Sequence, residues 1–310
     1  MLLMTVNTVS WSSSKKPLVR YLRPVNSSPS IVTDVLDLVT TLRGHGWNWS
    51  RGLHVPHETR PTNRMTFALY SLFSAIVHAL MCGSLSRAIY VWTGGDKGSS
   101  IFDETLPFFA RYLRSSIISI LAGFQIYTVM QMGYDASTVI NVLLFRQDPI
   151  RWPPLFDKPW CSTSLNEFWS HRWHQLFRRM FLLCAHPFSL VFGRAGTIVG
   201  AFLASGLIHC VLMAPFERNI EPWSFLVGFG MMAPGVLAER AYYKLTGKRV
   251  GGVVGWFWTL TWLLLWGNMI TDGFARVGLF TCSSYIDSKS PLGALAEKLV
   301  IDFDAWLHTI

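Results

Sequence analysis

Charged side chains are scarce in this 310-residue sequence, where Asp, Glu, Lys and Arg make up 15% and hydrophobic types make up 51%. Soluble domains carry about 25% charged residues, so the deficit argues against an ordinary soluble domain and favours a membrane protein. The 14 Trp and 21 Phe residues fit aromatic belts at a membrane interface. Basic cytosolic loops explain the net charge of +9. Because no soluble nucleic-acid-binding motif accompanies that charge, we expect no nucleic-acid partner.

Cysteine is also sparse, with five scattered residues and no CxxC pair. This odd set argues against a disulfide framework and a cysteine zinc site. The GxSxG elbow, the P-loop and the dinucleotide fingerprint are absent, which argues against the enzyme classes that these motifs mark. The first twenty residues lack the basic-then-apolar order of a signal peptide. We therefore expect an internal span to direct membrane insertion.

Long apolar stretches predict membrane-spanning helices. Each stretch would be about 26–32 Å long as a helix, close to the roughly 30 Å bilayer core. A further apolar stretch at 176–193 contains arginines and a proline, which predicts a re-entrant or tilted segment. The sequence thus predicts an all-α, multi-pass membrane protein with about 5–7 transmembrane helices. The five clearest spans are 65–81, 115–133, 195–215, 223–243 and 253–270.

Polar and apolar segments divide the chain into two predicted parts. Residues 1–64 are rich in Ser, Pro and Arg and read as a mostly extramembrane segment with a short helix near 31–43. Residues 65–310 form the integral-membrane domain, which ends in an amphipathic helix near 292–310. This division places the chemistry of the protein in the second part.

Loop charges predict the orientation of the spans. The segment 144–194 and the connection 244–252 are basic, whereas the connection 216–222 between them is acidic. The positive-inside rule then places the two basic segments in the cytosol and the acidic one in the lumen. We expect a multi-pass protein of the endoplasmic reticulum, and the pattern indicates no oligomeric state.

The most polar stretch of the membrane domain is "SLNEFWSHRWHQLFRR" (164–179). Ser164 and Glu167 form a capping box, which predicts that a helix starts here and runs to about residue 180. At 100° per residue the helix separates a polar row from an apolar face that carries Trp169 and Trp173. The row is either the solvated face of an interfacial helix or the wall of an active site. It consists of Glu167, His171, His174 and Arg178.

A lone histidine, His209, lies deep in the apolar run "FLASGLIHCVLM". Ionisable groups at such depth are costly and indicate either function or a paired interior contact. A stripe of small residues at 196, 200 and 204 suits close helix packing. On the opposite side, His209 follows Ser205 by one turn and can face a cavity. The alternative is a histidine bonded to the backbone of a neighbouring helix.

The same region offers side chains that could bind a metal ion. Glu167, His171 and His174 could face one ion, and imidazole with carboxylate suits iron or zinc. The chain has a single HxxH and no second histidine box. We therefore expect no metal.

Three elements together resemble the wax-synthase-type branch of the membrane-bound O-acyltransferases. "SLNEFWSHRWHQLFRR" is similar to that branch's S-L-x-x-F-W-x-x-R-W-H element, and "SGLIH" to its histidine-bearing apolar helix. "RGHGWNW" (43–49) resembles an upstream element of fungal members, many of which acetylate terpenoid and meroterpenoid hydroxyls. The chain departs from the family in two ways: His45 replaces a small apolar residue, and the usual upstream spans have no counterpart before residue 43.

The resemblance implies a helical bundle around a tunnel, which acyl-CoA enters from the cytosol and a hydrophobic small-molecule alcohol enters from the bilayer or lumen. The family's intramembrane histidine maps onto His209, and its second polar position maps onto His174. We expect no bound cofactor, with acetyl-CoA as the co-substrate. The residues expected to contact substrate or CoA are Trp169, Arg172, Trp173, Arg178 and Ser205.

Histidine suits the base role because its ordinary pKa is about 6.5 and burial disfavours its charged form. We hypothesise that His209 takes the hydroxyl proton and that His174 stabilises the oxyanion. The expected enzyme is an acetyl-CoA-dependent O-acetyltransferase. Two alternatives stay open: a long-chain wax-ester synthase, and a membrane transporter or scaffold in which His209 is a proton-coupled site.

Overall fold

In the part of the chain that the computed structural model describes, the regular secondary structure is helical, apart from one isolated bridge between Arg20 and Trp47. Its main helices are α2 (Ile31–Thr40), α3 (Arg64–Trp92), α4 (Phe108–Leu143), α5 (Leu165–Glu167), α6 (Arg178–Cys184), α7 (His186–Met213), α8 (Pro222–Gly230), α9 (Met232–Thr246), α10 (Gly252–Arg276) and α12 (Pro291–Leu307). The described residues are 11, 17–21, 31–41, 43–50, 52–93, 98–216, 220–281 and 290–309.

Four helices in the described residues are long and apolar enough to cross a membrane. They are α3, α4, α7 together with the short turn that follows it, and α10, and they contain four of the five predicted spans. The prediction of an all-α, multi-pass membrane protein is thereby confirmed. Three residues of the predicted luminal connection 216–222, residues 217–219, lie outside the described residues.

The fifth predicted span, 223–243, is wrong as a continuous helix. The structure divides it into α8 and α9, with Met231 between them. Pro234 explains the break, because it has no N–H to donate to the carbonyl of Gly230 four residues earlier. The indole Nε1 of Trp262 donates to the carbonyl of Met231, the residue between the two helices, at 2.9 Å.

The chain consists of two compact units, each assembled from three segments. The first unit contains Met1–Tyr70, Thr138–Ala204 and Val236–Trp256, and the second contains Ser71–Ser137, Ser205–Gly235 and Phe257–Ile310. The unit boundaries fall inside α3, α4, α7, α9 and α10, so the long helices belong partly to each unit.

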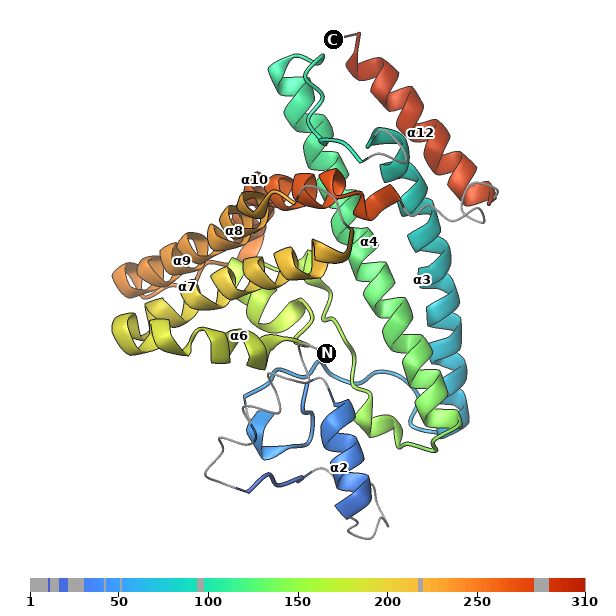
Figure 1. The fold of residues 1–310 in the computed structure, drawn as a ribbon, viewed down its shortest axis with the longest axis vertical. Helices are drawn as coiled ribbons and strands as arrows, with labels where there is room; N and C mark the ends of the chain where they lie inside the picture. Colours follow the sequence, from blue (N-terminus) through green and yellow to red (C-terminus); the bar gives the residue numbers. More distant parts are fainter. Residues whose placement is uncertain are drawn as a thin grey trace. The chain divides into compact units, whose positions relative to one another are not determined.

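In the second unit, α3 and α4 run side by side (Figure 1), and polar side chains join them. Ser74 Oγ donates to Asp135 Oδ2 at 2.7 Å, and Gln125 Nε2 donates to Ser86 Oγ at 2.8 Å. Hydrogen bonds of this kind hold helices together in lipid, where apolar side chains gain little from association.

The C-terminal helix α12 is attached to both α3 and α4 in this unit. Arg87 binds Glu297 and Arg114 binds Asp304, each at 2.7 Å. Leu307 is fully buried in a cluster with residues of α4 and the loop before it. The predicted amphipathic tail helix is therefore present, and its polar side forms ion pairs.

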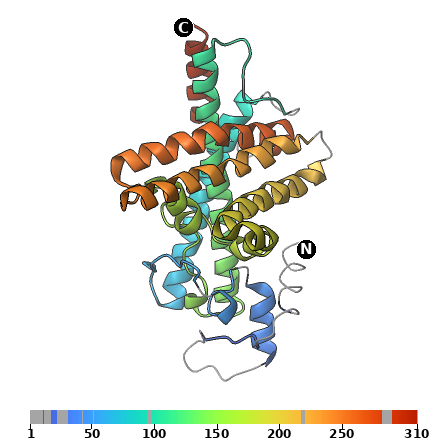
Figure 2. The same cartoon turned by 90° about the vertical axis from the view of Figure 1, so that its left-hand side faces the viewer.

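The helices α8 and α10 also pack together in the second unit (Figure 2), where glycines allow a close approach. A Cβ on Gly273 would lie 2.8 Å from Ser224 Cβ, and one on Gly228 would lie 2.5 Å from Ile270 Cγ1. These contacts fix the position of Phe225 and Phe229 relative to α10.

In the first unit, the apolar stretch 176–193, which was predicted to be re-entrant or tilted, forms the first arm of a helical hairpin. The second arm is the part of α7 that follows Gly193. The chain reverses at Gly193 (φ 56°, ψ −136°), a conformation that other residues rarely adopt. A Cβ on Gly196 would overlap the carbonyl of Phe188, and one on Gly200 would lie 2.9 Å from Ala185 Cα. The predicted stripe of small residues therefore packs against the preceding arm of the hairpin. After the reversal, residues 194–213 extend about 30 Å.

Candidate active site

The segment that begins at Ser164 starts as predicted and then departs from a regular helix. Ser164 Oγ accepts the N–H of Glu167 at 3.0 Å, which confirms the N-cap. The chain continues as α5 and then as a π-helical turn, η5 (Phe168–Arg172). Trp173 has extended backbone angles, and its N–H donates to the carbonyl of Phe168, five residues earlier, at 2.8 Å. The predicted continuous helix over 164–180 is therefore wrong.

Side-chain hydrogen bonds explain this break. Gln175 is buried, and its Nε2 donates to the carbonyl of Trp169 at 3.0 Å and to that of Trp173 at 2.8 Å. In a regular helix, backbone N–H groups would occupy both carbonyls. π-helical turns of this kind are rare and often occur at functional sites.

The break separates the residues of the predicted polar row, which do not share one helical face. Glu167 binds Arg172, and His171 lies with its ring centroid 5.0 Å from that of His54. His174 lies among aromatic rings instead, 5.9 Å from Phe156. The row assumed a rotation of 100° per residue, which the π turn and the extended Trp173 do not follow.

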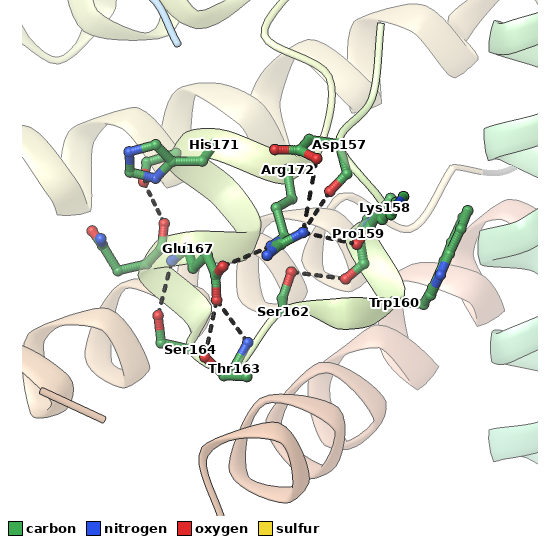
Figure 3. A network of polar contacts seen from close by, with 12 residues as sticks. Asp157, Lys158, Pro159, Trp160, Ser162, Thr163, Ser164, Glu167, His171 and Arg172 are labelled. Atoms are coloured by element: carbon green, nitrogen blue, oxygen red, sulfur yellow. Dashed lines mark hydrogen bonds and ion pairs between the residues drawn. The ribbon is translucent and has the colours of Figure 1, made fainter. Parts of the chain in front are cut away.

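Arg172 lies at the centre of a polar network (Figure 3). Its Nε donates to Glu167 Oε1 at 2.7 Å, and its Nη1 donates to the carbonyl of Asp157 at 2.9 Å. Glu167 Oε2 also accepts from the backbone N–H and the hydroxyl of Thr163 at 2.8 and 3.0 Å. Burial alone would raise the pKa of Glu167, but the hydrogen bonds from Thr163 and Arg172 outweigh it and lower that pKa. The Arg172 guanidinium thus holds the turn in place.

Glu239 of α9 holds the start of the same segment, and sequence reasoning did not identify it. Its side chain is buried, and its carboxylate oxygens accept from the N–H of Leu165 at 2.6 Å and of Asn166 at 3.0 Å. Two backbone donors at the N-terminus of α5 are satisfied in this way. The available signal was an acidic residue inside a predicted apolar span, which calls for a specific partner.

The two tryptophans expected to contact substrate pack against phenylalanines of the first unit. Trp169 meets Phe202 edge-on, with ring centroids 5.7 Å apart, and Trp173 stacks on Phe168 at 5.4 Å. Trp173 also lies 5.5 Å from His174. These contacts enclose the imidazole of His174 in an aromatic environment.

The "RGHGWNW" element lies beside the residues that follow the π turn. Arg43 donates to the carbonyls of Pro153 and Pro154 at 2.7 and 2.9 Å. Arg179 donates to the carbonyl of Trp49 at 3.0 Å and lies 4.4 Å from the centre of its ring. Between the two elements is a cavity of about 150 Å³. Its lining consists of Arg43, Trp49, Ser50, Leu53, Gln175, Leu176, Arg178, Arg179 and Leu182.

In the second unit, His209 lies against two phenylalanines from other helices. Its ring stacks on Phe229 with centroids 4.3 Å apart, and the ring of Phe274 lies 6.0 Å away. Its Nδ1 is 2.7 Å from the carbonyl oxygen of Ser205. A carbonyl only accepts, so Nδ1 carries the proton and the neutral ring keeps its acceptor lone pair on Nε2.

No group of three or more His, Cys, Asp or Glu side chains in the described part of the chain has an arrangement suited to a metal ion. The polar groups of the region are imidazoles, guanidiniums and hydrogen-bonded carboxylates. They suit proton transfer and the binding of anionic or polar groups.

The four helices that are long and apolar enough to cross a membrane define a multi-pass membrane protein, and one of them carries His209. Residues 152–229 match the membrane bound O-acyl transferase family. This segment contains both the π turn and His209. The resemblance predicted from the sequence is thereby confirmed.

Three relatives illustrate the match. Acetyltransferase ple2 of Rhodocybe pseudopiperita is 25% identical over 245 residues, covering 74% of this chain and 62% of the relative. Acetyltransferase sirH of Emericella nidulans is 23% identical over 301 residues, covering 87% and 68%. A long-chain-alcohol O-fatty-acyltransferase of Simmondsia chinensis is 30% identical over 162 residues, covering 49% and 42%. The chain therefore spans only part of each relative, and no solved structure matches it.

Proposed function

We propose that this chain is an O-acyltransferase that acetylates a hydroxyl group of a terpenoid or meroterpenoid, with acetyl-CoA as the donor. The observation that carries the proposal is the orientation of His209. Its Nδ1–H is bonded to the carbonyl of Ser205 within an apolar helix, so Nε2 is the free acceptor. Two of the relatives described above are named acetyltransferases, which supports the choice of acyl group.

In the proposed reaction, Nε2 of His209 removes the proton of the acceptor hydroxyl as its oxygen attacks the thioester carbonyl. The new C–O bond forms, the C–S bond breaks, and the proton passes from the imidazolium to the CoA thiolate. The products are an ester and free CoA, so no other reactant is required. A positioned base of this kind contributes about 10²–10⁴-fold to the rate.

The proposal gives His174 the role of stabilising the oxyanion of the tetrahedral intermediate. Its aromatic surroundings support this role, because a donor in a water-poor environment interacts more strongly with developing charge. Arg172 is proposed to position the π turn, since Glu167 and Asp157 already occupy its guanidinium. Trp169 and Trp173 are proposed to shape the aromatic surroundings of His174, and Ser205 is proposed to orient His209.

A long-chain wax-ester synthase is the second candidate. The relative from Simmondsia chinensis supports it, because that protein is named for long-chain alcohols. Both reactions use the same base and differ in the lengths of the acyl chain and the alcohol. For either reaction we propose a multi-pass enzyme of the endoplasmic reticulum whose residues 1–64 are mostly extramembrane.

The test is expression of the full chain in a host that lacks the activity, followed by feeding with hydroxylated terpenoids and, separately, long-chain alcohols. We expect an acetylated terpenoid, detected by its mass, together with CoA release from microsomes that depends on the added alcohol. A long-chain ester instead would favour the second candidate. Membranes that contain the protein and release no CoA with any alcohol would contradict both.

A further inference from the structure

The cavity between the "RGHGWNW" element and the residues after the π turn is basic. Three arginines line it, from two parts of the sequence more than a hundred residues apart, and its lining includes no Asp or Glu. Its neutral wall is formed by Trp49, Ser50, Leu53, Gln175, Leu176 and Leu182. Positive charge is therefore concentrated at this point of the first unit without a carboxylate in the lining to balance it.

Two of the arginines are fixed by the fold. Arg43 is buried and donates to two proline carbonyls, and Arg179 is held by the carbonyl and the ring of Trp49. Both guanidiniums are cationic, because arginine stays protonated in proteins. Such immobilised guanidiniums lose little side-chain freedom when a ligand binds, which favours an anion of matching shape.

Arg178 differs from the other two. In the described part of the chain its guanidinium forms no ion pair and no side-chain hydrogen bond. Burial lowers the pKa of Arg178, because its charge is partly removed from water. A half-buried, unpaired guanidinium beside two fixed ones would gain most from a bound anion.

The volume of the cavity limits the size of the ligand that it can enclose. Pockets that enclose a whole small molecule have roughly 300–1,000 Å³, whereas this cavity has about 150 Å³. It is too small for a nucleoside and suits one compact anionic group. Guanidiniums bind phosphate oxygens with pairs of parallel N–H bonds, and a terminal phosphate presents three such oxygens.

We propose that this cavity binds a terminal phosphate monoester and that Arg178 is its principal contact. If the proposed function holds, on which this assignment of the ligand rests, the group is the 3′-phosphate of CoA. A lipid headgroup with a terminal phosphate, such as phosphatidic acid, carries the same chemistry. The site would then distinguish acetyl-CoA from acetyl-3′-dephospho-CoA, which keeps the diphosphate but lacks the monoester.

The first experiment measures KM for both donors with the full-length protein in microsomes. We expect the wild type to prefer acetyl-CoA and Arg178→Gln to raise its KM for acetyl-CoA about 10–100-fold, as for one lost charged hydrogen bond. The KM for acetyl-3′-dephospho-CoA should stay unchanged, which also shows that the variant is folded. Arg178→Lys should retain part of the preference. Arg194→Gln, which alters an exposed arginine beside the hairpin reversal, is the matched control.

A binding measurement separates this proposal from the proposed function. Radiolabelled CoA and 3′-dephospho-CoA are bound to the purified full chain, which requires no turnover. Tighter binding of CoA that Arg178→Gln abolishes would support the site even if no acceptor is acetylated. Equal binding of the two compounds, or a preference that survives Arg178→Gln, would overturn the assignment to CoA even in an active enzyme.

The second arm tests the lipid source in nanodiscs with and without phosphatidic acid. If the wild type shows no preference for CoA, but phosphatidic acid raises its melting temperature and Arg178→Gln removes that effect, the cavity holds a lipid phosphate. If Arg178→Gln removes neither a CoA preference nor a phosphatidic acid effect, the cavity is no phosphate site.

Discussion

Replacing Glu239 by Gln should loosen the segment that carries His174. Glu239 is 7% exposed, and its carboxylate accepts two backbone N–H groups, from Leu165 at 2.6 Å and from Asn166 at 3.0 Å. Glutamine has one acceptor oxygen, so one of these N–H groups would face an NH₂ group instead. The variant therefore keeps one neutral hydrogen bond and leaves one buried donor without a partner.

The magnitude follows from these two bonds. Hydrogen bonds to charged groups contribute about 1.5–3 kcal/mol, and a buried donor without a partner costs about 1–3 kcal/mol. Ser164 still caps the turn through the N–H of Glu167, so the variant keeps its N-cap. We expect the free energy of unfolding to fall by about 2–3 kcal/mol.

The assay is thermal unfolding of the purified protein in detergent, followed by tryptophan fluorescence, together with kcat for acetyl transfer. Glu239→Gln should melt at a lower temperature and lose kcat, because His174 follows the loosened segment. Glu239→Asp should recover part of both. Glu104→Gln, which alters an exposed glutamate, is the control and should match the wild type. A Glu239→Gln protein with wild-type melting temperature and kcat would refute this reasoning.

Two further predictions concern the first unit. The pKa of Glu167 is lowered, so its stabilising effect is complete above the ordinary value of 4.5 and disappears as the pH falls through the folded-state pKa. Glu167→Gln should therefore melt at a lower temperature than the wild type at pH 7, and the difference in melting temperature should close in acid. A difference that stays constant with pH would contradict this. Gly196→Ala should destabilise the hairpin by about 1–3 kcal/mol, because its Cβ would overlap the carbonyl of Phe188, whereas Gly123→Ala, whose Cβ would meet nothing within 4 Å, should be tolerated. Equal melting temperatures for the two alanine variants would disprove the close approach.

The long helices were predictable because length and apolar composition are properties of the local sequence. Hydropathy located α3, α4, α7 and α10, and the Ser164 cap followed from its spacing to Glu167. The division between α8 and α9 had a local signal in Pro234, which an analysis of hydropathy alone overlooks.

The π turn could not be predicted in the same way. It depends on Gln175 bonding two carbonyls and on Arg172 reaching Asp157, a contact between residues 15 positions apart. A helical-wheel projection takes account of neither hydrogen bond, and it therefore placed His171 and His174 on one helical face. Glu239 was missed for a similar reason, because its partners lie more than seventy residues earlier in the chain.

At the intramembrane histidine, the sequence placed Ser205 one turn before His209, and the structure adds the hydrogen bond between the carbonyl of Ser205 and Nδ1 of His209 in the same helix. The stacking on Phe229 depends on how α8 packs, which the sequence did not indicate. The catalytic roles proposed for His209 and His174 stay predictions.

The most direct test of the proposed chemistry compares two intramembrane histidines. His78 of α3 has the same local geometry, with Nδ1 2.8 Å from the carbonyl oxygen of Ser74, and lies outside the matched family segment. At equal expression in microsomes, His209→Ala should lower alcohol-dependent CoA release by about 10²–10⁴-fold, whereas His78→Ala should keep it. Wild-type turnover by His209→Ala would contradict the account.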